Sequence, residues 1–406
     1  MVICRNLLLP LALPALFFAV NAGGQTTAPG GAARGGRGGG ASATPVTALV
    51  SPEVHADRTI TFRFRAPQAT QVQLAGEVLQ GKGPLAMMKD DAGVWTTTIG
   101  PIPPEIWIYN FRVQGVDVTD PSNPAVKPVP PGFAMSSFVE VPGNSPAFYD
   151  SRPVPHGDVR MVDYESATFG VTRSMWVYTP PNYDKSNAKY PVLYLLHGNG
   201  EALNGWVMNG RANIILDNLI ADHKALPMIV VMPQGHALQA PNVGPLARVA
   251  AGETNMFSPR FPKELLNEVV PFVERKFRVL ANPNNRAIAG LSMGGGQALS
   301  IGLQHPELFR YVLGFSAAIG GQFLDIDETI RPLLASPEAT NAKFHLIWLS
   351  VGRQDFLFKP NEQLASAMKQ AGVKNTWRET EGAHVWSVWR HNLNEAAPLL
   401  FRAGSH

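Results

Sequence analysis

The sequence has very few of the residues that hold a fold together by covalent or ionic links. One cysteine in 406 residues excludes an intramolecular disulfide and a cluster of thiolate metal ligands. Charged residues make up 16% of the chain and the net charge is only +3, so the clustered basic face that nucleic acid requires is not expected. After the N-terminus, no apolar run approaches the ~20 residues that a membrane-spanning helix needs. We therefore expect no metal, no other cofactor, no nucleic-acid partner and no membrane span.

The N-terminus has the pattern of a secretory signal peptide. Arg5 precedes a short apolar run, Leu7–Val20, and small residues precede a cleavage site after Ala22. The run is shorter than the ~20 residues of a membrane span and contains two prolines, which argues against an uncleaved anchor. We expect residues 1–22 to be removed on export, which gives a secreted or periplasmic protein. Cleavage would also remove Cys4, so the mature chain would have no cysteine.

Glycine and proline are abundant, with 38 and 35 residues, and they gather between folded parts. Nine of the glycines lie in residues 23–40. A segment of this composition cannot bury enough apolar surface to offset its ordering entropy. We therefore expect a flexible linker over residues 23–44. Residues 143–157 are rich in Pro, Gly and Ser, and they are expected to form a second linker.

A set of short strands is expected over residues 45–142. In Thr59–Arg65, the apolar side chains of Ile60, Phe62 and Phe64 alternate with polar ones, which is the pattern of a half-buried strand. Similar runs follow at Val72–Leu74, Val94–Ile99, Ile106–Val113 and Phe138–Val141. Strands of this length and spacing predict a small all-β, immunoglobulin-like sandwich domain.

Motifs in this region carry a family resemblance. They are Gly93–Trp95, Tyr109–Val113 and Asp120–Pro121. They resemble motifs of the early-set domains related to glycogen-binding modules, which precede many carbohydrate-active enzymes. The aromatic side chains of Trp95, Trp107 and Tyr109 either stack on sugar rings or pack in the core. Packing is favoured for Trp95 and Tyr109, because aromatic residues at strand spacing usually pack.

From residue 158 to residue 403, strands and helices alternate. The expected strands include Met175–Tyr178, Val192–Leu196, Met228–Met232, Arg286–Gly290, Tyr311–Phe315, Phe344–Ser350 and Thr376–Thr380. Helices are expected at Ile214–His223 and Glu264–Phe277. Apolar strands that alternate with helices predict a mostly parallel sheet with helices on both faces.

A G-x-S-x-G motif, Gly290–Gly294, lies between one of these strands and the start of a helix. In this context the motif forms a sharp turn, whose glycines leave room for close backbone contact. The turn would expose the hydroxyl of Ser292 at the carboxyl end of the strand, above the N-terminus of the following helix. Ser292 is therefore the candidate nucleophile.

A serine nucleophile needs a base that is oriented by an acid, and in this fold the chain order is Ser, acid, His. His384 lies in a Gly-containing loop between a strand and a helix, so it is the preferred base. His391, about two turns into that helix, is the alternative. Asp355 follows the end of a strand and is the preferred acid. The other acids between Ser292 and His384 that we considered are Asp325, Asp327 and Glu328.

The oxyanion that forms during acyl transfer requires two backbone N–H donors. One is expected from Met293, directly after the nucleophile. The other is expected from Asn199 in His197–Gly200, with its neighbour Gly198 as the alternative. Trp206 and Trp386 lie near these segments in sequence, and we expect them to line the substrate cleft. The Pro- and Gly-containing stretch 236–256 is expected to be a lid or specificity loop.

With these residues, the second region closely resembles the esterase D-like α/β-hydrolases, in particular the feruloyl and acetylxylan esterases of carbohydrate esterase family 1. The resembling segments are Val177–Tyr183, Tyr194–Gly200, Gly210–Asn213, Gly290–Gln297 and Gly382–Trp386. The resemblance implies an α/β-hydrolase fold over residues 158–403 and a triad of Ser292, Asp355 and His384. One departure is the sequence His-Gly-Asn-Gly, where the family has a run richer in glycine.

The expected function is therefore a secreted serine esterase that cleaves feruloyl or acetyl esters on plant polysaccharide. The same triad also suits a siderophore esterase, a polyesterase or an acyltransferase. An alternative without catalysis is a carbohydrate-binding protein with an inactive hydrolase fold. The expected partner is a polysaccharide or a small ester, and the oligomeric state is not predicted.

Overall fold

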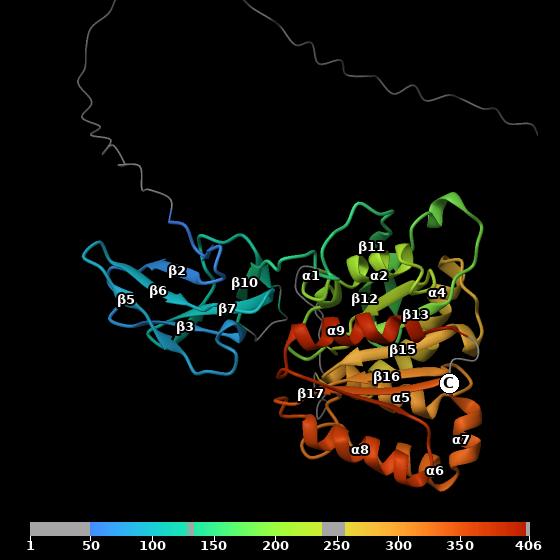
Figure 1. The fold of residues 1–406 in the computed structure, drawn as a ribbon. Coiled ribbons are helices and arrows are strands. Elements are labelled where there is room, and N and C mark those ends of the chain that lie inside the picture. The colour runs from blue at the N-terminus through green and yellow to red at the C-terminus, as the bar shows by residue number, and fades with distance from the viewer. Residues whose placement is uncertain (1–48, 128, 130–133, 238–255, 403–406) are drawn as a thin grey trace, which may run out of the picture. The chain divides into compact units, whose positions relative to one another are not determined.

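The structure is a computed structural model that describes residues 49–127, 129, 134–237 and 256–402. The expected signal peptide, the Gly-rich linker and most of the loop 236–256 lie outside the described residues. Strands come first along the chain and an α/β region follows (Figure 1). Within the described residues, no helix is both long and apolar enough to cross a membrane.

Two antiparallel sheets make up the first part, which we call the β region. One sheet has the order β1-β2-β6-β5, and the other has the order β4-β3-β7-β10-β9 with β8 paired to β7. The strands are β1 (Glu53–Val54), β2 (Ile60–Arg65), β3 (Val72–Ala75), β4 (Leu85–Ala86), β5 (Met88–Lys89), β6 (Val94–Ile99), β7 (Glu105–Val113), β8 (Val116–Val118), β9 (Val126–Lys127) and β10 (Ser136–Val141), with a short helix η1 (Glu77–Leu79) after β3.

The two sheets share one apolar core. Phe62 of β2 contacts Tyr109 of β7 with ring centroids 4.7 Å apart. Trp95 and Tyr109 are buried in this core, with 7% and 0% of their surface exposed. These two aromatic residues therefore pack, and only Trp107 of the three considered keeps partial exposure.

An eight-stranded mixed sheet forms the centre of the α/β region. Its order is β11-β12-β14-β13-β15-β16-β17-β18. The strands are β11 (Asp158–Ser166), β12 (Val171–Thr179), β13 (Val192–Leu196), β14 (Ile229–Pro233), β15 (Arg286–Leu291), β16 (Tyr311–Phe315), β17 (Leu346–Gly352) and β18 (Thr376–Thr380). The pairs β11–β12 and β12–β14 are antiparallel, and the remaining pairs are parallel. The predicted mostly parallel sheet is confirmed.

Helices cover both faces of this sheet (Figure 1). They are α1 (Gly205–Met208), α2 (Ala212–Ala221), α3 (Arg260–Glu264), α4 (Val270–Lys276), α5 (Met293–Gln304), α6 (Asp327–Ala335), α7 (Pro337–Lys343), α8 (Phe358–Ala371) and α9 (Trp386–Ala396), with short turns η2 (Tyr183–Lys185), η5 (Pro283–Asn285) and η6 (Ala397–Leu399) and a π-helical stretch η4 (Leu265–Val269) between α3 and α4. Alternating residues of β13 explain the two layers. Leu193 and Leu195 face a core with α2 and α9, whereas Tyr194 and Leu196 face one with α4, α5 and α8.

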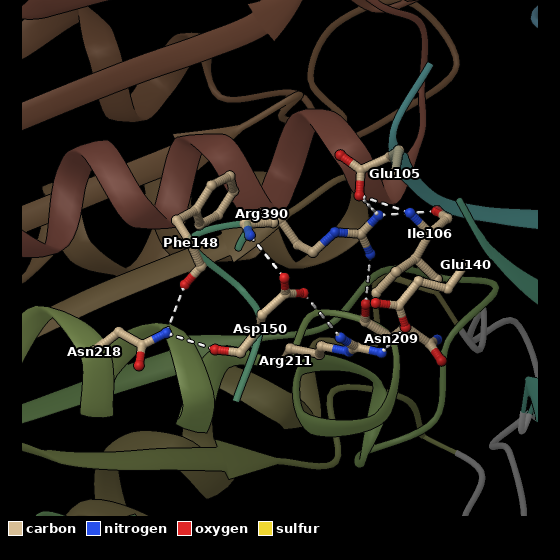
Figure 2. A network of polar contacts seen from close by, with 10 residues as sticks. Glu105, Ile106, Glu140, Phe148, Asp150, Asn209, Arg211, Asn218 and Arg390 are labelled. Carbon is tan, nitrogen blue, oxygen red and sulfur yellow. Dashed lines mark hydrogen bonds and ion pairs between the residues drawn. The ribbon is translucent and has the colours of Figure 1, made fainter. Parts of the chain in front are cut away.

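The segment 143–157 was expected to be a linker, and it contains no helix or strand. It nevertheless packs against the α/β region. Tyr149 is buried, and the amide of Asn218 on α2 donates hydrogen bonds of 2.9 Å to the carbonyl groups of both Phe148 and Asp150 (Figure 2). Composition alone could not indicate this packing, because it depends on partners about 70 residues away along the chain.

Candidate active site

Ser292 lies on the tight turn between β15 and α5. Its backbone has φ 53° and ψ −117°, a conformation that is costly for a residue with a side chain and that occurs at functional sites. The turn depends on two glycines: a Cβ on Gly290 would lie 2.3 Å from the carbonyl of Gly294, and one on Gly294 would lie 2.5 Å from the carbonyl oxygen of His197. No Cβ fits at either position, so the turn requires glycine at both ends of the Gly-x-Ser-x-Gly motif.

A continuous series of hydrogen bonds joins Ser292, His384 and Asp355. His384 Nε2 lies 2.9 Å from Ser292 Oγ. His384 Nδ1 lies 2.9 Å from Asp355 Oδ2 and 3.1 Å from Oδ1. The Asp355 carboxylate has no exposed surface and also accepts a hydrogen bond from the backbone N–H of Leu357. This is the arrangement that activates a serine hydroxyl for attack on an acyl group.

The three residues meet because β15 and β17 end at the same edge of the parallel sheet. Asp355 follows β17, and His384 lies between β18 and α9. Gly352, the last residue of β17, is in close contact with the histidine loop, since a Cβ there would lie 2.2 Å from the carbonyl oxygen of Gly382. A glycine at this position lets the acid and base loops approach each other.

The alternative candidates do not lie in this series. His391 contacts the ring of Phe148 and lies 3.9 Å from the carboxylate of Glu105. Asp325 and Asp327 are exposed near the start of α6, where the backbone N–H of Asp327 donates a hydrogen bond to Asp325 Oδ1. Glu328 forms an ion pair with Arg331. None of them has a hydrogen bond to Ser292 or His384 within the described residues.

The expected oxyanion donors lie on either side of the nucleophile. Met293 begins α5, and Gly198 packs against the nucleophile turn, since a Cβ on Gly198 would lie 2.6 Å from Leu291 and 3.4 Å from Ser292. Within the described residues, the backbone N–H groups of Met293, Gly198 and Asn199 donate to no protein acceptor. These N–H groups are therefore free to bind an oxyanion, and Gly198 stays an alternative to Asn199.

Two buried histidines, His197 and His236, support the loop of Asn199, a role that no motif in the sequence indicates. His236 Nε2 lies 3.2 Å from Asn199 Oδ1. His197 Nε2 accepts a hydrogen bond of 2.9 Å from the N–H of Gly235, and the two rings are 4.9 Å apart. Burial lowers the pKa of His197 to about 4. Burial and the nearby His197 lower the pKa of His236 to about 3. Both rings are therefore neutral at neutral pH.

These histidines predict a loss of stability in mild acid. Their pKa values in the folded protein lie below the ordinary value of 6.5, so the unfolded chain binds protons first. The two neutral histidines therefore contribute to the free energy of unfolding above pH 6.5, and this contribution is lost as the pH falls toward 4. Replacing His236 with glutamine removes one of the two groups that take up a proton on unfolding. The variant's free energy of unfolding should therefore fall less steeply between pH 6.5 and 5. Urea unfolding at several pH values measures this slope, and parallel curves for the two proteins would contradict it.

The expectation that Trp206 and Trp386 line the substrate cleft is wrong. Their exposed fractions are 0% and 1%, and the two rings pack edge to face, 5.3 Å apart. Their indole N–H groups donate to the carbonyl oxygen of Leu196 and to the carboxylate of Glu201. Both rings are buried in the core between the sheet and α9. The two tryptophans therefore support the catalytic loops from within the core and do not line a cleft.

An exposed aromatic residue lies beside the candidate base instead. Phe356 follows Asp355 directly, and 65% of its surface is exposed. Its ring centroid is 4.6 Å from that of His384 and 6.1 Å from that of Phe323. An aromatic side chain that is left in solvent at this position offers apolar surface to a bound group. The signal for Phe356 in the sequence is its position directly after the predicted acid.

The described residues contain no group of three His, Cys, Asp or Glu side chains that could hold a metal ion. The hydrogen-bonded series from Ser292 through His384 to Asp355 supports acyl transfer through the serine hydroxyl.

Several proteins that are similar to this chain are named as esterases. The sequence model of a family described as "Putative esterase" matches residues 166–400. The endo-1,4-beta-xylanase/feruloyl esterase of Xylanibacter ruminicola is 33% identical over 358 residues, which are 86% of this chain and 46% of that protein. A solved ferulic acid esterase is 28% identical, with a TM-score of 0.52 over 60% of this chain and 97% of its own.

A further structure, the enterobactin esterase FES of Shigella flexneri, has a TM-score of 0.63 over 84% of this chain and 92% of its own. At 20% identity this likeness shows the fold alone. The chain spans about half the length of the curated relatives it matches, with 46% and 58% of the first two. The matches over 84% and 86% of the chain are too long for the α/β region alone, so they include part of the β region.

Proposed function

Because this chain belongs to the esterase family, we propose that it hydrolyses carboxylic esters through an acyl-enzyme on Ser292. The observation that carries this proposal is the hydrogen-bonded series from Ser292 through His384 to the buried carboxylate of Asp355. A serine hydroxyl is a weak nucleophile unless such a base is oriented against it.

In the proposed reaction, Ser292 Oγ attacks the ester carbonyl while its proton passes to His384 Nε2. Asp355 keeps the other ring nitrogen protonated and stabilises the imidazolium that forms. The N–H groups of Met293 and Asn199 bind the negative oxygen of the tetrahedral intermediate. The C–O bond to the alcohol then breaks as His384 protonates the leaving oxygen. Water repeats the same sequence on the acyl-enzyme and releases the acid.

The proposed substrates are feruloyl or acetyl esters on plant polysaccharide. Support comes from the relative that is named as a xylanase and feruloyl esterase, and from the exposed ring of Phe356 beside His384. A phenolic acyl group presents a flat apolar face that such a ring can contact. We also propose export through residues 1–22, and an early-set, carbohydrate-binding-module-like fold for residues 45–142.

A panel of esters tests the substrate class: methyl ferulate, acetylated xylan, a catecholate siderophore ester and p-nitrophenyl acetate. We expect kcat/KM to be highest for methyl ferulate or acetylated xylan. Replacing Phe356 with alanine should lower kcat/KM for methyl ferulate by about tenfold, the value of one or two kcal/mol of lost aromatic contact. The same variant should change p-nitrophenyl acetate turnover much less.

Met161→Ala is the matched control, because Met161 is also an exposed apolar residue, with 59% of its surface accessible, but lies on β11. It should leave all four rates unchanged. Preference for the siderophore ester would favour a siderophore esterase instead. Comparable rates on all four esters would contradict the polysaccharide assignment and leave only a general esterase.

A further inference from the structure

The carboxylate of Glu201 joins two loops that carry the proposed catalytic groups. Glu201 lies two residues after Asn199, and its side chain is 6% exposed. Its Oε1 accepts a hydrogen bond of 3.0 Å from the indole N–H of Trp386, two residues after His384. Its Oε2 accepts one of 2.6 Å from the amide of Asn209. A shift of this carboxylate would therefore move the oxyanion loop and the histidine loop together.

The connection continues from Trp386 to the base itself. Trp386 packs edge to face on Trp389, with ring centroids 5.3 Å apart. Trp389 in turn contacts the ring of His384 edge to face at 4.9 Å, and its indole N–H donates to Ser316. The position of His384 thus depends on a packed pair of indoles that Glu201 holds by one hydrogen bond.

The cation that pairs with Glu201 comes from the β region. Lys127 Nζ lies 2.6 Å from Glu201 Oε1, and Lys127 is held in β9 by its pairing with Ser136 of β10. Within the described residues no other cation forms an ion pair with Glu201. Burial raises the pKa of Glu201, and Lys127 acts most strongly in the opposite direction. A buried carboxylate without this partner would be protonated more easily.

Other charged groups near this carboxylate already have partners or oppose it. Arg390 of α9 is fully buried and binds the carboxylate of Glu105 at 2.8 Å and the carbonyl oxygen of Asn209 at 2.6 Å (Figure 2). Glu77 of η1 and Glu105 of β7 add negative charge around Glu201 and Lys127, and burial raises the pKa of Glu77 to about 7. Arg390 therefore attaches the β region to α9, whereas Lys127 forms the ion pair with Glu201 and also lowers the pKa of Glu77 by its charge.

We propose that Lys127 is a positioning residue for ester hydrolysis, which holds the Glu201 carboxylate where it ties the loop of Asn199 to the loop of His384. The β region then contributes a residue that positions two loops of the active site. This inference rests on the proposed hydrolase function. It predicts an effect on turnover from a residue that touches neither the substrate nor the three proposed catalytic residues.

The test uses the full-length protein with p-nitrophenyl acetate as substrate. In Lys127→Met, we expect kcat to fall by about tenfold to a hundredfold, as for other small misplacements of catalytic groups, with KM within about twofold of the wild type. Lys127→Arg keeps the charge and should restore kcat.

The double variant Lys127→Met, Glu201→Gln separates positioning from folding. It removes both charges, and a neutral glutamine can still accept from Trp386, while Asn209 can turn its unpaired Oδ1 toward the new amide. We expect kcat to recover at least threefold relative to Lys127→Met. Lys224→Met is the control, because Lys224 forms an exposed ion pair with Asp222 on the surface.

Wild-type kcat in Lys127→Met would overturn the inference. So would a double variant as slow as Lys127→Met, or a loss that Lys127→Arg does not reverse and that follows a lowered Tm. Absence of esterase activity in the wild type would instead refute the proposed function. The two failures are therefore distinguishable.

Discussion

Ser292→Ala is expected to lower kcat for p-nitrophenyl acetate by about five to six orders of magnitude. Removal of a triad serine costs about 10⁶ in a well-studied protease, because the remaining groups have no nucleophile to activate. Alanine keeps the turn between β15 and α5 free of any larger side chain, so the fold should persist. Steady-state kinetics and Tm on the purified variant measure both effects.

A fluorophosphonate probe supplies an independent measurement of the same residue. The wild-type protein should be labelled on Ser292, and Ser292→Ala should not be labelled. Ser300→Ala is the matched control, because Ser300 lies on the same helix α5 and its hydroxyl accepts a hydrogen bond from the amide of Gln304. Unchanged turnover in Ser292→Ala, or labelling elsewhere, would displace Ser292 as the nucleophile.

Asp355→Asn is expected to lower kcat by about 10⁴ while leaving the fold intact. The carboxylate accepts from His384 Nδ1 and from the N–H of Leu357. An amide of the same size can direct its own N–H at the imidazole, which then presents the wrong nitrogen to Ser292, as the corresponding change does in a serine protease. Kinetics at several pH values measure the loss, and Tm reports on the fold.

The control for this variant is Asp325→Asn, the same change at one of the three other candidate acids. Asp325 is exposed and accepts a hydrogen bond from the N–H of Asp327 near the start of α6. It should retain wild-type turnover. If Asp325→Asn were the slower of the two variants, the proposed assignment of Asp355 would be wrong.

The elements around the nucleophile could be predicted because their signals are local. The strand expected at Val192–Leu196 is β13, and those expected at Tyr311–Phe315 and Thr376–Thr380 are β16 and β18. Runs of apolar residues bounded by turns specify such buried strands over a few positions. The motif Gly290–Gly294 is equally local, since its two glycines are required by contacts within a few ångströms of the turn.

The roles of the tryptophans could not be predicted, because they depend on contacts between distant segments. Trp206 and Trp386 are 180 positions apart in sequence, yet their rings touch in the core. Hydrophobic pattern indicates that such residues are often buried, but it does not say which of them faces a cleft. Phe356 shows the opposite case, since it is exposed next to a buried acid.

The sequence by itself predicted seven of the eight strands of the α/β sheet and named a serine, an acid and a histidine as candidates. It could do so because strand pattern, turn glycines and chain order are properties of short segments. Only the tertiary structure decided that His236 lies under Asn199 and that Lys127 of the β region pairs with Glu201. These contacts form between residues 37 and 74 positions apart. Burial sets the protonation of these side chains and the strength of these contacts, and burial exists only once the chain has folded.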